Sequence, residues 1–189
     1  VNLEIRETLR EKGVVGAGGA GFPTYAKLKQ GGIDYYIANG AECEPLLDVS
    51  KEIMARFPDR VVKALNILKD STGAKRAVIA LKGKYKQAIK ALDEELSQTG
   101  SDIELFQLGD FFPAGDEQVM VYEVTGKVVP EGGIPIAVGA VVNNIETLFN
   151  VYGAIEEDAP VTQKFITVGG QVKDPITLKV PVGNKMIAI

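Results

Sequence analysis

The stretch AVIAL at residues 77–81 decides the fold of this chain. A short run that is apolar at every position is typical of a strand buried on both faces of a parallel sheet. Three further strands are expected at residues 35–38, 103–108 and 140–142. The sequence therefore predicts a mainly parallel sheet of about four strands.

Helical segments separate these strands. Apolar residues recur at helical spacing within residues 59–69 and 85–96. Further helices are expected over residues 1–12, 24–30 and 116–124, and Thr24 can cap the second of these. Another helix is expected to run to residue 152, with Asn143 or Asn144 as its cap. Strands that alternate with helices indicate an α/β fold, here a three-layer α/β/α domain.

The chain changes character after Gly153. The acidic stretch EEDAP at residues 156–160 is typical of a linker, and two strands are expected beyond it, at residues 165–168 and 177–180. This tail is too short to form a domain by itself. We therefore expect an α/β domain over residues 1–155, a linker over 156–163 and a truncated β-rich segment over 164–189.

Composition excludes several kinds of chemistry. The 189 residues include 21 Lys and Arg against 25 Asp and Glu, a net charge of −4, with one cysteine and no histidine or tryptophan. The chain therefore contains no intrachain disulfide, no histidine-based catalytic pair and no histidine metal site. A single thiolate also cannot hold an iron–sulfur cluster by cysteine alone.

Apolar runs in the sequence are only a few residues long, far below the ~20 residues that a membrane span requires. The first residues show no succession typical of a secretory signal, although the chain begins with Val1. We therefore expect a cytoplasmic protein.

Glycine is the one residue type in excess, at 21 of 189, and several glycines gather in GAGGAG at residues 16–21, the glycine loop. The pattern G-x-G-x-x-G permits positive φ angles and lets backbone amides approach a phosphate. A dinucleotide-binding fingerprint should follow a strand and open a long helix, whereas this loop follows a predicted helix and leads into Phe22-Pro23. The pattern alone fits a phosphate-binding loop and a tight connector between helices equally.

Four motifs in order resemble one family. Residues 16–27, GAGGAGFPTYAK, resemble the flavin loop of the complex I flavin subunit and, more closely, that of the RnfC protein of the Rnf electron-transport complex. The nearest branch contains the cobalamin reductases of propanediol-utilising bacteria and the electron-transfer protein of proline reductase. NGAECEP at 39–45, PAGDE at 113–117 and VNNIETL at 142–148 follow in the family's order. The tail resembles the small β-grasp (SLBB-like) module that follows the flavin domain in this family.

This resemblance implies that the chain is an FMN-dependent NADH dehydrogenase module. Hydride would pass from NADH to the flavin, and electrons would leave toward [4Fe-4S] centres in regions absent from these 189 residues. The implied partners are NADH and a downstream electron-acceptor protein or iron–sulfur domain. Peripheral association with a membrane complex and a place inside a bacterial microcompartment are both compatible with this resemblance. The cofactor supplies the chemistry, so no side chain needs to act as a general base.

The resemblance implies that the glycine loop and Lys27 hold the phosphate or ribityl part of FMN. The loop would offer the amides of Gly16, Ala17, Gly18 and Gly19, and Lys27 would add a positive charge. Ala17 stands where complex I relatives have an arginine, which removes one cation. Phe22 matches an aromatic residue that stacks on the nucleotide, because a flat ring offers apolar area at little entropic cost.

Polar residues after the other strands complete the implied site. Asn39 would contact the flavin, and Glu42 and Glu44 would accept hydrogen bonds from ribityl, ribose or nicotinamide groups. Contacts to flavin or NADH are also implied for Gly115, Asp116, Glu117, Asn143, Asn144 and Thr147, with Phe111 or Phe112 beside the flavin. Without the resemblance, Glu42 and Glu44 also suit a solvated acidic loop. Asp116 and Glu117 also suit a helix N-terminus, where negative charge is favourable.

Two other features are expected to be structural. Cys43 lies between two glutamates, which disfavour a thiolate, so we expect a small loop residue without redox function. Residues 75–90 contain six basic and no acidic residues, but Tyr85 is their one aromatic residue. This pattern favours solvated faces over a nucleic-acid site, and we expect no nucleic-acid partner.

Two alternatives remain beside the main hypothesis. The substitutions at Ala17 and Asp116 keep open a non-catalytic nucleotide- or partner-binding module that has lost the flavin. The second alternative is a fragment whose activity needs regions outside these 189 residues. The motifs do not distinguish NADH from NADPH or name the terminal electron acceptor.

Overall fold

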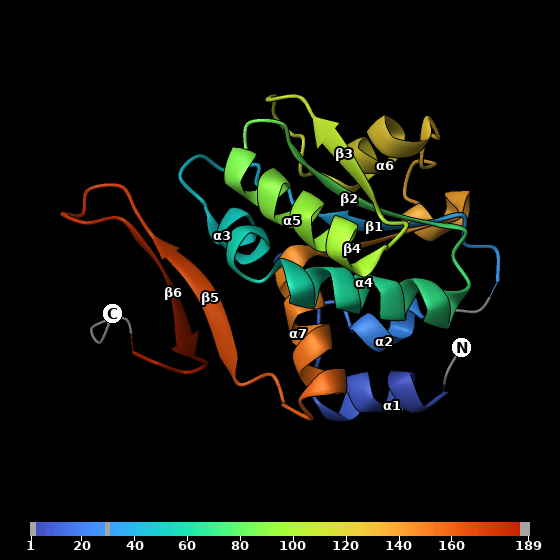
Figure 1. Cartoon of the computed structure of the whole chain (residues 1–189), viewed down its shortest axis with the longest axis horizontal. Coiled ribbons are helices and arrows are strands. Elements are labelled where there is room, and N and C mark those ends of the chain that lie inside the picture. Colours follow the sequence, from blue (N-terminus) through green and yellow to red (C-terminus); the bar gives the residue numbers. More distant parts are fainter. Residues whose placement is uncertain (1–2, 29–30, 186–189) are drawn as a thin grey trace.

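A four-stranded parallel sheet forms the centre of the α/β domain (Figure 1). The structure is a computed structural model that describes residues 3–28 and 31–185. The strands lie in the order β3-β2-β1-β4, with bounds β1 (Tyr35–Asn39), β2 (Arg76–Lys82), β3 (Glu104–Leu108) and β4 (Ala140–Asn144). All three neighbouring pairs are parallel, which confirms the predicted sheet.

The register aligns the carboxyl end of β1 with that of β4, while β2 continues to Lys82. Asn39 at the end of β1 lies opposite Ala80 on one side and Asn144, the last residue of β4, on the other. β1 is therefore buried between two partners, and four of its five residues are buried. The loops that follow the strands leave from one edge of the sheet, where open α/β sheets place their ligands.

Both faces of the sheet are covered, which confirms the three-layer architecture. Tyr36 and Ile79 belong to a large core that also includes side chains of α1 (Leu3–Glu11), α3 (Val49–Arg56), α4 (Pro58–Thr72), α5 (Lys86–Thr99) and α7 (Ile145–Glu156). Ile37 and Ala80 face a smaller core built with α6 (Glu117–Thr125) and the end of the 3-10 helix η1 (Pro135–Val138). Successive strand residues thus alternate between two cores, and residues 77–81 are buried throughout.

Helix α3 is an element that the sequence analysis did not predict. The side-chain Oε1 of Glu42, in the loop before the helix, accepts a hydrogen bond from the amide of Ser50 in its first turn (2.8 Å). Ile53 and Met54 are fully buried against the main core. A helix of eight residues carries too short an apolar pattern to be recognised alone, and tertiary contacts stabilise it.

Two local predictions were wrong. Helix α2 (Thr24–Lys27) begins at Thr24, with Pro23 as its N-cap residue and no side-chain cap. The Thr24 hydroxyl is buried without a hydrogen-bond partner among the described residues. The 3-10 helix η1 lies inside residues 126–139, where the lack of a helical or strand pattern in the sequence predicts a loop. Val1 and Gln30, the predicted ends of two helices, lie outside the described residues.

The C-terminal segment forms an antiparallel hairpin beside the α/β domain (Figure 1). Its strands are β5 (Gln163–Val168) and β6 (Ile176–Pro181), which confirms the two predicted strands. The hairpin contacts the domain where the ring of Phe165 meets that of Phe149 edge-on at 5.2 Å. Helix α7 extends to Glu156, the first residue of the predicted linker. The domain boundaries and the β-grasp assignment stay predictions.

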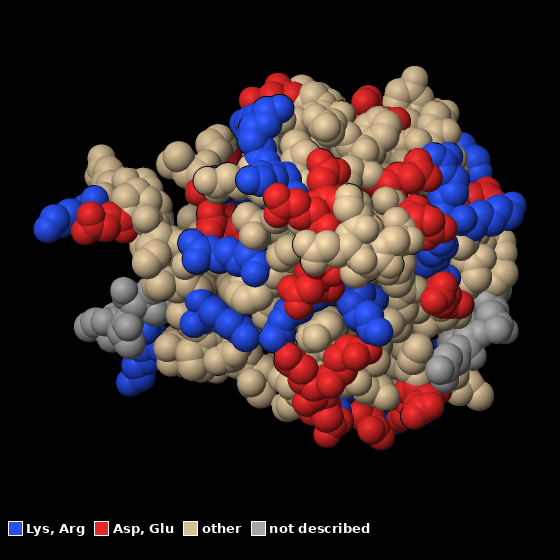
Figure 2. Space-filling model, in the orientation of Figure 1, with Lys and Arg blue, Asp and Glu red and all other residues tan. Residues whose placement is uncertain are grey.

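No helix among the described residues is long and apolar enough to cross a membrane. Five of the six basic residues of the run at 75–90 pair with acids among the described residues outside the run. Lys75 contacts Asp34 (2.8 Å), and Lys84 contacts Asp110 (2.8 Å). Figure 2 shows Lys and Arg interspersed with Asp and Glu over the visible face. This arrangement is typical of a solvated surface.

Asp34 connects segments at the amino end of the sheet. Its two carboxylate oxygens accept hydrogen bonds from the amino groups of Lys75 and Lys127, each at 2.8 Å. The hydrogen bond from Lys127, followed by that from Lys75, lowers the pKa of Asp34 to about 2. Because the folded pKa lies below the usual value, the unfolded chain binds the proton more tightly. The carboxylate therefore stabilises the fold above pH ~4, and this contribution is lost as the pH falls toward 2.

Asp34→Asn is expected to flatten the pH dependence of stability in this window. Urea midpoints measured between pH 2 and 5 should fall less steeply for the variant than for the unmodified chain as the pH is lowered, because one depressed carboxyl group is absent. Asp93→Asn on α5 is the matched control, since Asp93 forms no ion pair with the described residues. Identical slopes for all three proteins would contradict the prediction.

Candidate functional site

The loops after β1 and β3 are joined at the carboxyl edge of the sheet. The side-chain Nδ2 of Asn39 donates to the carbonyl oxygen of Gly115 (2.7 Å), and its Oδ1 accepts from the amide of Ala41 (3.1 Å). The amide of Gly115 donates to the Sγ of Cys43 (3.2 Å). Cys43 thus acts as an acceptor within a structural contact between two loops.

Gly115 is required at this contact for a steric reason. A Cβ at position 115 would lie 2.4 Å from the carbonyl oxygen of Ala41 and 2.9 Å from the Sγ of Cys43. A side chain would therefore push the two loops apart.

The glycine loop is a tight reversal between α1 and α2. Val15 and Pro23 form an isolated antiparallel bridge, and the amide of Gly16 donates to the carbonyl oxygen of Phe22 (2.8 Å). At the tip, Gly19 has a φ of +118°, which strongly favours glycine.

The loop lies against the start of α7. The amide of Ala17 donates to the Thr147 Oγ1 (2.9 Å), and a Cβ on Gly18 would lie 3.5 Å from the Cβ of Asn144. The amides of Gly16 and Ala17 are therefore engaged within the chain. Those of Gly18 and Gly19 have no partner of ordinary geometry among the described residues, which leaves them as donors for a ligand.

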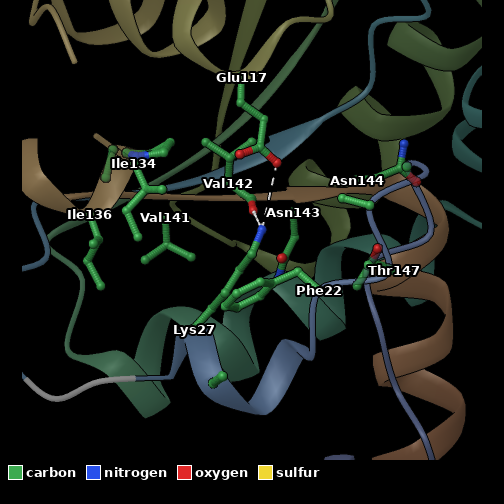
Figure 3. Close-up of a pocket in the computed structure, with 16 residues that line it drawn as sticks. Phe22, Lys27, Glu117, Ile134, Ile136, Val141, Val142, Asn143, Asn144 and Thr147 are labelled. Carbon is green, nitrogen blue, oxygen red and sulfur yellow. Dashed lines mark hydrogen bonds and ion pairs between the residues drawn. The ribbon is translucent and has the colours of Figure 1, made fainter. Parts of the chain in front are cut away.

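A cavity of about 330 Å³ opens beside this loop (Figure 3). It is bounded by the glycine loop, α2, β4, η1 and the first residue of α6. Its apolar wall contains Ile134, Ile136 and Val141. The other residues around it are Gly16, Gly18, Ala20, Phe22, Ala26, Lys27, Glu117, Pro135, Ala140, Val142, Asn143, Asn144 and Thr147.

Lys27 is the cation of this cavity. Its amino group donates to the carbonyl oxygen of Val142 (2.6 Å) and lies 3.7 Å from the Oε1 of Glu117. It also lies 5.8 Å from the centre of the Phe22 ring. Figure 3 shows Lys27, Phe22 and Glu117 reaching the same space from α2, the loop and α6. The Phe22 side of the cavity is open, because that residue is 47% exposed.

The structure brings eight of the predicted site residues together around this cavity: Gly16, Gly18, Phe22, Lys27, Glu117, Asn143, Asn144 and Thr147. Five others do not line it: Ala17, Gly19, Asn39, Gly115 and Asp116. Glu42 and Glu44 line a second hollow instead.

The polar residues at the helix starts have structural partners. Asp116 is the N-cap of α6, with its Oδ1 accepting from the amides of Gln118 (2.9 Å) and Val119 (3.0 Å). Asn144 is the N-cap of α7. The buried Asn143 instead donates from Nδ2 to the hydroxyl of Tyr36 (2.7 Å), and burial raises the pKa of that phenol, which keeps it neutral.

The second hollow, of about 590 Å³, lies beyond the joined loops. Lys82 and Lys84 share Asp110 there, at 3.4 and 2.8 Å, and the hydrogen bond from Lys84 lowers the pKa of that carboxyl group. Phe111 and Phe112 line this hollow, and neither lines the first cavity.

Two contact residues were missed by the sequence analysis. Glu146 is 2% exposed and binds the amino group of Lys164 and the amide of Phe165 (2.9 Å). Lys164 also donates to the carbonyl oxygen of Ala17 (3.0 Å). The position of Glu146 inside the motif VNNIETL could have indicated a role for it. No sequence pattern marks its partner Lys164 in β5.

Comparison with known proteins identifies the family. The Nuo51 FMN-binding domain matches residues 9–153, which include the glycine loop, the whole sheet and most of α7. The chain belongs to this family. The resemblance inferred from the four motifs is therefore confirmed.

Curated relatives of this FMN-binding domain are oxidoreductases. The chain is 46% identical over 182 residues to the cobalamin reductase PduS of Citrobacter freundii, covering 96% of this chain and 40% of that protein. It is 34% identical over 189 residues to a component of the proton-translocating ferredoxin:NAD(+) oxidoreductase complex of Clostridium ljungdahlii, covering 96% of this chain and 41% of that protein. The chain thus spans about two fifths of the length of these relatives.

A solved structure shares the fold. The NAD+-reducing [NiFe]-hydrogenase in its H2-reduced state aligns with a TM-score of 0.81 at 23% identity, covering 95% of this chain and 37% of that one. The predicted fold class is confirmed by this match and by the parallel sheet.

Gly115→Ala is expected to lower the free energy of unfolding by about 1–3 kcal/mol, because the new Cβ meets backbone that cannot move aside freely. Urea denaturation measures the change. Gly153→Ala within α7 is the control, since its Cβ would meet nothing closer than 3.9 Å and alanine favours a helix. An equal effect of both substitutions would rule out the steric explanation.

Proposed function

We propose that the 330 Å³ cavity binds FMN and that the domain takes electrons from NADH for an acceptor outside this chain. Membership of the FMN-binding family and the oxidoreductase relatives support an electron-transport flavin module. The use of NADH, the individual binding residues and the onward transfer to iron–sulfur centres are the proposed part.

The combination of walls around the cavity carries this proposal. Ligand pockets typically measure ~300–1,000 Å³, so a volume of about 330 Å³ suits a ligand that projects partly from the mouth. The apolar wall of Ile134, Ile136 and Val141 suits a flat aromatic ring system. The glycine loop and Lys27 offer amide donors and a positive charge, which suit a phosphate. The residues present therefore fit FMN.

Each residue has a role that its position supports. Lys27 and the amides of Gly18 and Gly19 would hold the phosphate or the adjoining ribityl chain. These local donors matter because the net charge of −4 does not attract an anion. Asn144, at the end of β4, would orient the ligand from the sheet edge.

Bound FMN would supply the redox chemistry by accepting a hydride from NADH and releasing electrons singly. The side chains would bind and orient the two reactants and exclude water. Phe22 is half-exposed at the open side and offers a stacking surface to NADH. Glu117 would accept hydrogen bonds from sugar hydroxyl groups within reach of Lys27.

The direct test is an FMN titration of the purified chain followed by anaerobic addition of NADH. We expect quenching of flavin fluorescence on binding and loss of the oxidised flavin absorbance with NADH. A folded chain that binds no FMN would refute the proposal. A chain that binds NADH or a protein partner without flavin would instead be the non-catalytic module left open by its sequence.

Lys27→Gln is expected to weaken FMN binding about ten- to a hundredfold, since a charge-assisted hydrogen bond contributes ~1.5–3 kcal/mol. Riboflavin lacks the phosphate, so its affinity should change little. Fluorescence titrations of both ligands measure the difference.

Lys90→Gln is the matched control for this substitution. Lys90 lies on α5 with its side chain 78% exposed and pairs with Glu94 at 3.8 Å. Its removal should leave both affinities unchanged. Equal weakening of FMN and riboflavin by Lys27→Gln would show that the lysine does not recognise the phosphate.

A further inference from the structure

The peptide groups on both sides of Ala17 are held by residues distant in sequence. The Ala17 amide donates to the Thr147 Oγ1 in α7 (2.9 Å). The Ala17 carbonyl oxygen accepts from the amino group of Lys164 in β5 (3.0 Å). The glycine loop is thus fastened at one residue by two different elements.

The bond from Lys164 also orients the next amide. The carbonyl group of Ala17 and the N–H of Gly18 belong to one planar trans peptide group, so they point in opposite directions. Binding of the carbonyl oxygen by Lys164 therefore directs the Gly18 N–H away from β5. Gly18 lines the 330 Å³ cavity, and its amide has no partner of ordinary geometry among the described residues.

Lys164 is itself held by a buried carboxylate. Glu146 has a side chain 3% exposed, and its Oε2 contacts the Lys164 amino group while its Oε1 accepts from the Phe165 amide (2.9 Å). Both partners of this carboxylate come from β5. A buried charge that lost them would carry a large desolvation cost, so the contact favours an attached hairpin.

We propose that Lys164 and Glu146 are positioning residues by which the β5–β6 hairpin holds the glycine loop in its ligand-binding shape. Glu146 fixes Lys164, Lys164 fixes the Ala17 carbonyl group, and the Gly18 amide is thereby preorganised. Attachment of the hairpin and occupation of the cavity are then coupled in both directions. The effect on FMN rests on the proposed function, whereas the effect on the loop does not.

The first test uses the chain without ligand. Amide hydrogen exchange at Gly16 and Ala17, whose amides are hydrogen-bonded within the chain, should be faster by about tenfold or more in Lys164→Met, because a charge-assisted hydrogen bond that holds the loop is absent. Lys164→Arg keeps a charged donor and should restore slow exchange. Lys173→Met removes a charge at an exposed position of the same hairpin and should have no effect. Unchanged exchange in Lys164→Met would overturn the inference.

A double variant separates positioning from general destabilisation. Lys164→Met leaves Glu146 buried with its charge, whereas Lys164→Met combined with Glu146→Gln removes both charges and should recover much of the stability. Fast exchange confined to the glycine loop in the double variant would support the inference. Fast exchange that extends equally through α4 and β2 would show a merely structural role and overturn it.

The second test measures FMN affinity in the same variants. Lys164→Met should weaken binding about tenfold, with recovery in Lys164→Arg. If the unmodified chain binds no FMN, the proposed function fails while the exchange experiment still decides the positioning role. If it binds FMN and Lys164→Met loosens the loop without changing affinity, the link to the ligand is refuted.

Discussion

Parallel pairing of β1 with β2 and β4 is the constraint on which the other features depend. It places Asn39 beside Asn144 at one edge of the sheet, so the loops after different strands meet there. Both faces of the paired strands are buried, since Tyr36 and Ile37 enter different cores. A shift of register by one residue would exchange these faces and remove the polar residues from the edge together. The hydrophobic pattern therefore fixes the position of the site as well as the fold.

Two close contacts bring loops together at this edge of the sheet. Gly115 lets the loop after β3 approach the backbone of Ala41, and the glycine loop reverses tightly enough to reach Thr147 in α7. The cavity lies where the glycine loop, β4 and η1 meet, with Lys27 as its cation. Its backbone donors and apolar wall suit a ligand with an anionic end and a flat ring. Such a site binds and orients its ligand without a catalytic side chain, which agrees with a chain that contains no histidine.

Much of this could be predicted from local patterns. The run at residues 77–81 and the alternating helices indicated the parallel sheet, and four motifs indicated the family. Helix α3 escaped prediction because its first turn depends on Glu42 and its stability on burial of Ile53 and Met54. Thr24 was predicted to cap α2. Instead Pro23 is the N-cap residue, and Thr24 is the first residue of the helix with its hydroxyl group buried.

The sequence by itself determined the α/β class, the family and the residue types that would form the site, because periodicity and short motifs are local properties. Tertiary structure alone decided which of those residues share a cavity. Glu42 and Glu44 lie in a second hollow, while Asn39 and Asp116 use their polar groups to join loops and cap α6. It alone also revealed that Lys164 holds Ala17, since two residues so distant in the chain meet only after the hairpin packs against α7. Hydrogen bonds of this kind depend on three-dimensional proximity, which no local pattern encodes.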